Sequence, residues 1–355
     1  MPLNLLIKPC SSLCNIRCGY CFYLDECESR NVRSYGFMDE QTLEMTVCRA
    51  FEYARGSISF SFQGGEPTLC GTKFYENVLE MQKKYNKKKI AVYNSIQTNG
   101  TLINEEWAEF LFKNGFSAGI SADGTKEAHD KHRSGTWDAA TAAADLLVSH
   151  GVSVNILCVV TNENAKAPEK VYNTLKKYKY LQFIPCCDKN APASGERGAF
   201  LTPEAYRSFL NGIFSLYYRD YFSDPVYIRL FDNYVGILGG KTPEMCGALG
   251  HCACYGAVEA DGSVYPCDFY MTDGYRLGNV KENTFSEMFS SDLAKSFVET
   301  SYKVPDDCRT CPYRRVCGGG CRRENGKYCE SYRGFFDKNY EKAAELALRT
   351  AFLSV

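Results

Sequence analysis

Long apolar runs, an export signal and an excess of charge are all missing from this sequence. No window approaches the roughly 18 uninterrupted apolar residues of a membrane span, so we expect no contact with the bilayer. The first residues lack the basic stretch, apolar run and cleavage site of a secretory signal, which favours a cytoplasmic protein. Forty-one basic residues against 42 acidic ones leave a formal charge of −1. Nucleic acid is therefore not an expected partner.

Internal repeats and low-complexity stretches are also lacking. An apolar content of 45% with 23% charged residues is ordinary for a globular chain and excludes disorder. At roughly 150 residues per domain, the 355 residues predict two or three domains.

Cysteine, in contrast, is abundant, with 19 residues. A secreted disulfide scaffold would account for such a density only in an exported and usually short chain. The count is odd, and a chain of this length can bury a core without covalent staples. Thiolates that bind metal in a reducing cytoplasm are therefore the preferred interpretation.

The cysteines fall into two clusters around a cysteine-poor middle. Cys14, Cys18 and Cys21 form a C-x3-C-x2-C run near the start of the chain. A second set lies between 246 and 329 and consists of Cys246, Cys252, Cys254, Cys267, Cys308, Cys311, Cys317, Cys321 and Cys329. This distribution predicts two metal-bearing regions.

Strand-like and helix-like patterns alternate up to about residue 230. The expected strands are 3–8, 57–62, 91–97, 117–121, 152–160 and 180–185. Helical apolar spacing covers 39–54, 74–84, 104–114, 136–150 and 165–177, with a further helix at 202–220 that Thr202 can cap. Such alternation predicts an α/β fold with a parallel sheet, and six units indicate an open, partial (β/α)6 barrel with its ligands at the carboxyl ends of the strands.

The pattern changes after about residue 240. A hairpin is expected at 258–265 around Asp261-Gly262. Residues 306–334 have too few aliphatic side chains for a core, so this segment needs metal to fold. A closing helix is expected at 335–351. The predicted domains are therefore 1–235, 236–335 and the final helix at 336–355.

The first cysteine run suits a cluster with one open iron. A cubane iron–sulfur cluster takes four thiolates, one per iron, so three local ligands leave one iron free for an exogenous ligand. Zinc or redox thiols are the alternative, because Cys10 or Cys27 can supply a fourth zinc ligand.

This run, followed by Phe22, resembles the signature of radical S-adenosylmethionine (SAM) enzymes. The resemblance implies that the open iron chelates SAM, which is cleaved to a 5′-deoxyadenosyl radical. Gln63-Gly64-Gly65-Glu66-Pro67 follows the second expected strand and is similar to the GGEP motif of that superfamily. By the same resemblance, Ser121 and Asp123 are expected to contact SAM, while Gln97 and Asn99 close the preceding strand. Arg133 is a candidate partner of the SAM carboxylate, with an ordinary surface arginine as the alternative.

The later cysteines resemble the SPASM extension of radical SAM peptide-modifying enzymes. The resemblance implies two auxiliary clusters, and with the first this makes three [4Fe-4S] clusters. Auxiliary cluster I would take Cys246, Cys252, Cys267 and Cys321, and auxiliary cluster II would take Cys308, Cys311, Cys317 and Cys329. Cys254 competes with Cys252 for a ligand position. Ordinary buried or half-buried thiols are expected at Cys10, Cys27, Cys48, Cys70, Cys158, Cys186 and Cys187.

Segments outside the ligands resemble anaerobic sulfatase-maturating enzymes. They include Leu-Ile-Lys-Pro before the first run, Arg30-Asn31-Val32, Phe62-Gln-Gly-Gly-Glu-Pro-Thr68, Gln97-Thr-Asn-Gly-Thr and Tyr265-Pro-Cys-Asp-Phe-Tyr270. The resemblance implies oxidation of a cysteine, or in some members a serine, to Cα-formylglycine. The partners would be an unfolded or nascent sulfatase with a Cys/Ser-x-Pro-x-Arg motif and an electron donor such as flavodoxin or ferredoxin.

The same resemblance assigns roles to three further residues. Asp268 would be the base that accepts the substrate proton after abstraction of a Cβ hydrogen, with the auxiliary clusters accepting the second electron. Tyr23 and Gln63 would contact the substrate peptide. The main alternative is a SPASM peptide maturase that forms thioether or other crosslinks, and a non-catalytic iron–sulfur or zinc protein is the alternative from a different class.

Overall fold

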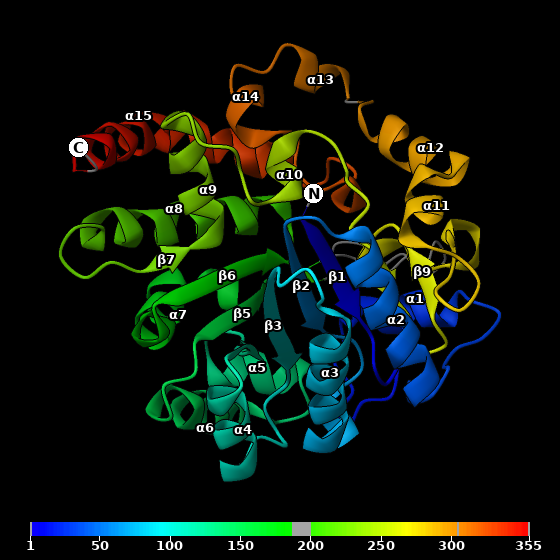
Figure 1. Cartoon of the computed structure of the whole chain (residues 1–355). Helices are drawn as coiled ribbons and strands as arrows, with labels where there is room; N and C mark the ends of the chain where they lie inside the picture. Colours follow the sequence, from blue (N-terminus) through cyan, green and yellow to red (C-terminus); the bar gives the residue numbers. More distant parts are fainter. Residues whose placement is uncertain (1, 187–199, 304, 354–355) are drawn as a thin grey trace. The chain divides into compact units, whose positions relative to one another are not determined.

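The computed structural model describes residues 2–186, 200–303 and 305–353, so Cys187 lies outside the described residues. The chain divides into two compact units (Figure 1). The first comprises Met1–Ser121, Thr136–Val154 and Ala253–Phe297, and the second comprises Ala122–Gly135, Asn155–Cys252 and Val298–Val355. No helix in the described ranges is long and apolar enough to cross a membrane.

A mostly parallel sheet forms the first unit. Strands β1 (Leu3–Ile7), β2 (Ser57–Phe62), β3 (Ala91–Thr98) and β4 (Phe116–Ser121) lie in this order and run parallel. On the other side of β1, β8 (Ala257–Val258) is also parallel and continues through an antiparallel hairpin into β9 (Ser263–Tyr265), which pairs with β10 (Gly278–Asn279). Ile58, Phe60 and Phe62 are buried and alternate with half-buried serines, as expected for a strand with one core face.

The helices of the first unit follow local sequence signals. Asp39 accepts from the backbone N–H of Thr42 and caps α2, and Asn104 caps α4 in the same way. Small side chains line α6, so Gly100 can lie in close contact with Ala143. The helices are α1 (Phe22–Glu28), α2 (Glu40–Tyr53), α3 (Gly71–Tyr85), α4 (Glu105–Lys113), α6 (Trp137–Ser149), α11 (Phe285–Ser290) and the start of α12 (Asp292–Ser301).

The second unit contains three parallel strands and a helical core. Strands β5 (Val154–Val160), β6 (Tyr180–Pro185) and β7 (Tyr227–Ile228) pair in this order. The long helix α15 (Cys329–Leu353) packs against α8 and α9, where Phe335 stacks on Phe231 at 5.4 Å (Figure 1). The remaining helices are α5 (Lys126–His132), α7 (Pro168–Leu175), α8 (Pro203–Asp220), α9 (Arg229–Leu238), α10 (Cys246–Leu249), α13 (Asp306–Arg309) and α14 (Arg314–Cys317).

The expected strands and helices are present, and Thr202 caps α8 as predicted. Two of the differences between the predicted and the observed elements have physical causes. The last helix begins at Cys329 rather than near residue 335, because Tyr332, Phe335 and Phe336 form one continuous buried face. The short strand β7 was not predicted, since two residues carry no periodic signal. The helix α15 runs unbroken through residue 335. The predicted domain boundaries remain a prediction.

Candidate functional site

The predicted site residues of the first unit gather at one edge of its sheet. Strands β1 to β4 are parallel, so their carboxyl ends meet there. The loop with Cys14 follows β1, Gln63 follows β2, Asn99 follows β3, and Ser121 ends β4. These residues therefore lie at the strand ends where the sequence pattern predicted them.

The glycine pair after β2 packs directly on the cysteine loop. Gly65 has a φ of +55°, and a Cβ there would lie 2.0 Å from the carbonyl oxygen of Leu13. The backbone N–H of Glu66 donates to the same carbonyl at 2.8 Å, and the Cys10 thiol donates to the Gly64 carbonyl at 3.2 Å. The glycines thus allow two loops to approach each other, and Cys10 reinforces this contact.

Glu66 connects the ends of β2 and β3. Its Oε1 accepts from the hydroxyls of Thr68 and Thr98, both at 2.6 Å, and its Oε2 accepts from the backbone N–H of Asn99 at 2.8 Å. Burial raises the pKa of Glu66, while these donors favour the charged form. A carboxylate oxygen has more than one lone pair, so Oε2 keeps capacity for a further donor.

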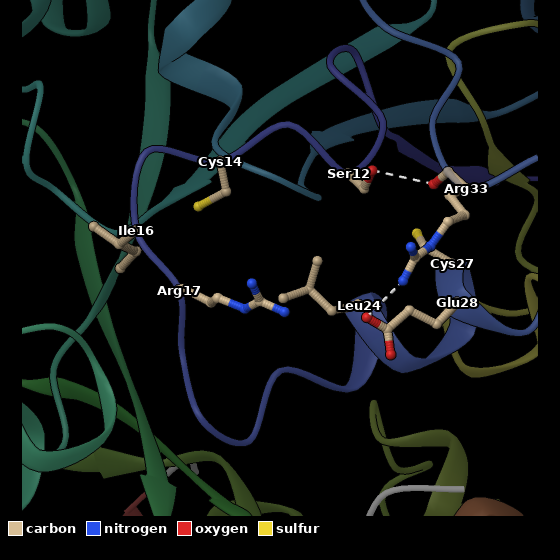
Figure 2. A pocket seen from close by; sticks show the side chains of 8 residues that line it. All are labelled: Ser12, Cys14, Ile16, Arg17, Leu24, Cys27, Glu28 and Arg33. Carbon is tan, nitrogen blue, oxygen red and sulfur yellow. Dashed lines mark hydrogen bonds and ion pairs between the residues drawn. The ribbon is translucent and has the colours of Figure 1, made fainter. Parts of the chain in front are cut away.

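The loop from Cys14 to Cys21 borders a pocket of about 330 Å³ (Figure 2). Cys14 and Arg17 lie on the loop side, and Leu24 and Cys27 of α1 lie opposite. The side-chain amide of Asn99 lies 3.9 Å from the Cys14 sulfur and donates to Asn15 at 2.9 Å, which holds the start of the loop against β3. Of the three cysteines in the run, Cys14 lines this pocket.

Asp268 lies in this unit as part of a charged group. It begins a 3-10 turn directly after Cys267. Its Oδ1 lies 2.5 Å from Nζ of Lys8 in an ion pair without hydrogen-bond geometry, and its Oδ2 accepts from Nε2 of Gln63 at 3.3 Å. Sequence reasoning did not single out Lys8. The available signal was its position directly after β1, at the edge where the site residues gather.

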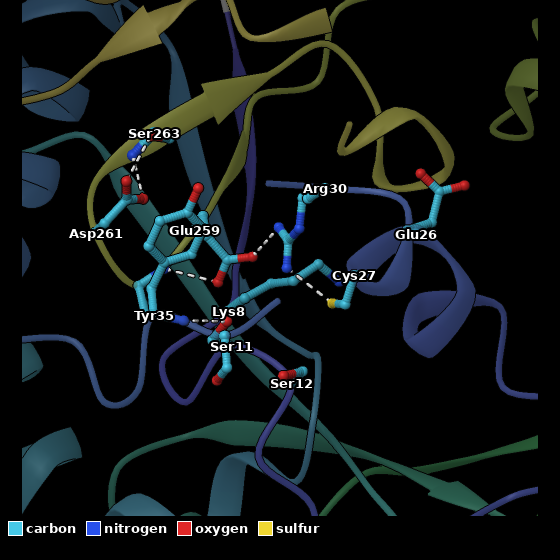
Figure 3. A network of polar contacts seen from close by, with 12 residues as sticks. Lys8, Ser11, Ser12, Glu26, Cys27, Arg30, Tyr35, Glu259, Asp261 and Ser263 are labelled. Atoms are coloured by element: carbon cyan, nitrogen blue, oxygen red, sulfur yellow. Dashed lines mark hydrogen bonds and ion pairs between the residues drawn. The ribbon is translucent and has the colours of Figure 1, made fainter. Parts of the chain in front are cut away.

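Tyr23 is buried beside Lys8, and its hydroxyl contacts a second ion pair, that of Arg30 and Glu259. The Lys8 ammonium lies 3.9 Å from the centre of the Tyr23 ring, and the Tyr23 hydroxyl donates to Glu259. Arg30 donates to Glu259 at 2.6 Å and to the Cys27 sulfur at 2.8 Å (Figure 3). Burial, and then the Glu259 charge, raise the pKa of Tyr23. Neither Arg30 nor Glu259 was a predicted site residue, although Arg30 was part of a recognised segment.

Ser121 and Asp123 fall in different units. In the first, the Ser121 hydroxyl accepts from Gln97 at 3.1 Å. In the second, Asp123 forms an ion pair of 2.9 Å with Arg133, and its backbone N–H donates to Nδ1 of His129 at 3.2 Å. Burial lowers the pKa of His129 to about 4, so the neutral ring can accept this bond. Asp123 and Arg133 were predicted as separate SAM contacts; they are partners of each other.

The four cysteines expected to hold auxiliary cluster II come together in the second unit. Burial, and then the charges of Cys308 and Cys311, raise the pKa of the Cys329 thiol. Burial, with repulsion from Cys329 and Cys308, raises the pKa of Cys317 to about 12. Such crowding disfavours four free thiolates and suits a shared cationic cluster.

Three of the four cysteines expected for auxiliary cluster I also lie in the second unit. A Cβ on Gly247, next to Cys246, would lie 3.3 Å from the backbone nitrogen of Cys321, so α10 contacts the Cys321 segment. Burial raises the pKa of Cys252, and the Cys246 charge adds to this effect. Cys254 instead directs its sulfur to the Ala294 carbonyl at 3.9 Å in the first unit. Cys267 also belongs to the first unit.

The state of the other thiols agrees with the sequence analysis. All 18 described cysteines are free, and Cys10, Cys27, Cys158 and Cys186 are buried, whereas Cys48 and Cys70 are half-buried. In the described part of the chain, no three His, Cys, Asp or Glu side chains converge on a point that one metal ion would occupy. A mononuclear zinc site needs such convergence, whereas each cysteine of a cubane binds its own iron.

Comparison with known proteins defines the class. A model of the radical SAM superfamily matches residues 9–175, and one of the SPASM iron–sulfur cluster-binding domain matches 252–312. A cysteine-type anaerobic sulfatase-maturating enzyme of Clostridium perfringens is 44% identical over 98% of both chains. A serine-type enzyme of Bacteroides thetaiotaomicron is 31% identical over 90% of this chain and 82% of its own.

A solved structure extends the likeness to three dimensions. Native anSMEcpe with bound AdoMet has a TM-score of 0.92 and 44% identity, covering 98% of this chain and 99% of its own. The same protein was solved with bound AdoMet and Cp18Cys peptide. The predicted fold class, a partial radical SAM barrel with a SPASM domain, is confirmed. The chain belongs to the anaerobic sulfatase-maturating enzymes, a family of radical SAM oxidoreductases.

Proposed function

We propose that this enzyme oxidises a cysteine of a sulfatase polypeptide to Cα-formylglycine. The observation that carries the proposal is the full-length likeness to the cysteine-type enzyme of C. perfringens, at 44% identity over 98% of both chains. Identity to a serine-type relative is lower, at 31%. This difference favours cysteine as the substrate residue, and the family favours formylglycine formation over thioether crosslinking.

Cys14, Cys18 and Cys21 would hold the first [4Fe-4S] cluster at the loop that follows β1. When bound, this cluster and SAM supply the abstraction of a hydrogen atom from the substrate Cβ. SAM would lie at the strand edge, near the free lone pair of Glu66 and the glycine turn. In the second unit, Asp123 and Arg133 form a pair at 2.9 Å, and both stay proposed SAM contacts.

Asp268 is the proposed base, and Gln63 and Tyr23 are the proposed contacts with the substrate peptide. The carboxylate is 16% exposed while its partner Lys8 is fully buried, so one side of the base faces protein and the other is accessible to a substrate. The substrate thiol loses its proton to this carboxylate. The Gln63 amide donates to Oδ2 at 3.3 Å. We therefore assign Oδ2 as the oxygen that faces the substrate.

Eight of the nine later cysteines would hold two auxiliary [4Fe-4S] clusters. Cys246, Cys252, Cys267 and Cys321 form the proposed set for cluster I, and Cys308, Cys311, Cys317 and Cys329 form the set for cluster II. The sulfur of Cys254 faces a carbonyl, which supports Cys252 as the ligand. The clusters supply an acceptor for the second electron, and flavodoxin or ferredoxin is the proposed donor of the first. Eighteen free cysteines support a reducing, cytoplasmic location.

The deciding experiment is anaerobic incubation with SAM, a reductant and a Cys-x-Pro-x-Arg sulfatase peptide, followed by mass spectrometry. We expect the mass change of an aldehyde at the cysteine and one 5′-deoxyadenosine per product. The matched Ser-x-Pro-x-Arg peptide is the control for substrate class. SAM cleavage without any aldehyde on either peptide would overturn the proposal.

A further inference from the structure

A buried lysine lies between the two side chains proposed to act on the substrate. Lys8 forms the 2.5 Å ion pair with Oδ1 of Asp268, and its ammonium lies over the ring of Tyr23. We propose that Lys8 is a positioning residue, which holds Oδ1 of Asp268 and thereby presents Oδ2, beside Gln63, to the substrate thiol. The inference rests on the proposed function and deepens it.

Lys8 itself is fixed from several sides. Its backbone N–H donates to the Val258 carbonyl at 2.9 Å, which ties β1 to β8. Its stem fills the space beside Gly64, where a Cβ would lie 2.7 Å from Cδ of the lysine. Gly64 has a φ of +115°, so a side chain is disfavoured there in any case. The ammonium therefore has little freedom to leave Asp268.

The surrounding charges leave Asp268 as the natural counterion of Lys8. Glu259 is a buried carboxylate that accepts from the Tyr23 hydroxyl, and it already pairs with Arg30 at 2.6 Å. Both members of that pair have fully buried side chains. A buried cation needs a paired anion, and Asp268 supplies it for Lys8. The Tyr23 hydroxyl is held by Glu259, which keeps the ring in place below the ammonium.

This arrangement makes the two oxygens of Asp268 unequal. Oδ1 faces the buried ammonium, whereas Oδ2 faces the Gln63 amide on the side open to a substrate. In the proposed step the substrate S–H bond breaks and an O–H bond forms at Oδ2. Without the ammonium the carboxylate can turn about its side-chain bonds, and a misplacement of about 1 Å is enough to slow such a step about 100-fold.

The test is Lys8→Met, which keeps the stem that packs on Gly64 and removes the charge. The purified, iron-loaded enzyme is given SAM and the Cys-x-Pro-x-Arg peptide, and formylglycine and 5′-deoxyadenosine are measured separately. We expect formylglycine formation to fall about 100-fold while SAM cleavage and the peptide Kd change less than about threefold. Lys8→Gln, which keeps a shorter polar group, should give a smaller fall of about tenfold.

The matched control is Lys73→Met, which removes a lysine paired with Glu76 at 3.0 Å on the surface of α3 and should leave both rates unchanged. Formylglycine formation within threefold of wild type in Lys8→Met would overturn the inference. So would an equal fall of both rates, or loss of iron from both Lys8 variants, since either result assigns Lys8 a purely structural role. A wild-type enzyme that cleaves SAM but makes no formylglycine would instead overturn the proposed function.

Discussion

The loop of residues 8–21 and the tail of residues 306–329 both carry clustered cysteines, but they are held in different ways. The loop is fixed by contacts with distant parts of the chain, such as Glu66 to Leu13 and Lys8 to Asp268. The tail consists of the four-residue helices α13 and α14 and the glycine run 318–320, in which every φ is positive. The tail also contacts distant residues, such as Tyr328 to the Cys186 carbonyl at 2.6 Å. Because α13 and α14 are only one turn long, we expect bound metal to contribute more to the shape of the tail than to that of the loop.

The largest expected effect is a loss of SAM cleavage, and it distinguishes the loop from the tail. Cys14→Ala removes a ligand of the first cluster, so we expect SAM cleavage to fall below detection. Because the loop is held by Leu13 and Asn15, the free energy of unfolding should change by only about 1 kcal/mol. Measurement of 5′-deoxyadenosine and of the melting temperature checks both statements. Loss of iron from the tail in this variant would contradict the comparison.

The next effect concerns the base at the edge of the loop. Asp268→Asn keeps the shape of the side chain but removes its ability to take a proton, so formylglycine formation should fall about 10²- to 10⁴-fold. SAM cleavage should continue, because Asp268 is not among the proposed cofactor ligands. Product formation at the wild-type rate, with normal SAM cleavage, would show that the base assignment is wrong.

Removal of iron should affect the two regions unequally. After chelation, we expect backbone amides of residues 306–329 to exchange with solvent as in an unfolded peptide, since this segment has little core of its own. Amides of β1 to β4 should keep their protection, because they pair within a buried sheet. Hydrogen exchange followed by mass spectrometry compares the tail and the strands in one sample. Equal loss of protection in both would show that the tail does not depend on metal more than the sheet does.

The smallest effect is on stability and uses two glycines with positive φ. Gly65→Ala forces a Cβ to within 2.0 Å of the Leu13 carbonyl, whereas a Cβ on Gly319 meets nothing within 4 Å. We expect Gly65→Ala to cost more than about 3 kcal/mol and Gly319→Ala about 1 kcal/mol from backbone strain alone. Thermal unfolding of the iron-loaded variants measures the difference, and equal costs would show that the tail is as tightly packed as the loop.

Several features of the fold were predictable because their signals are local. The strands from β1 to β6 each have an apolar run bounded by polar residues, and Thr202 and Asp39 mark helix starts by type and position. The short strand β7 was not predictable, since its two residues pair with β6 only through the path of the chain. The start of α15 at Cys329 was missed because a cysteine-rich segment hides its buried aromatic face.

The sequence by itself determined the chemistry that is available: the spacing of Cys14, Cys18 and Cys21, the second cysteine set, and the strand ends that carry Gln63 and Ser121. Only the tertiary structure decided which groups become partners. Tyr23 and Glu259 lie 236 residues apart in the chain, and Gln63 and Asp268 lie 205 apart. No spacing rule reaches across such distances, because the partner of a buried charge is selected by the folded path of the backbone and by the cost of leaving that charge unpaired.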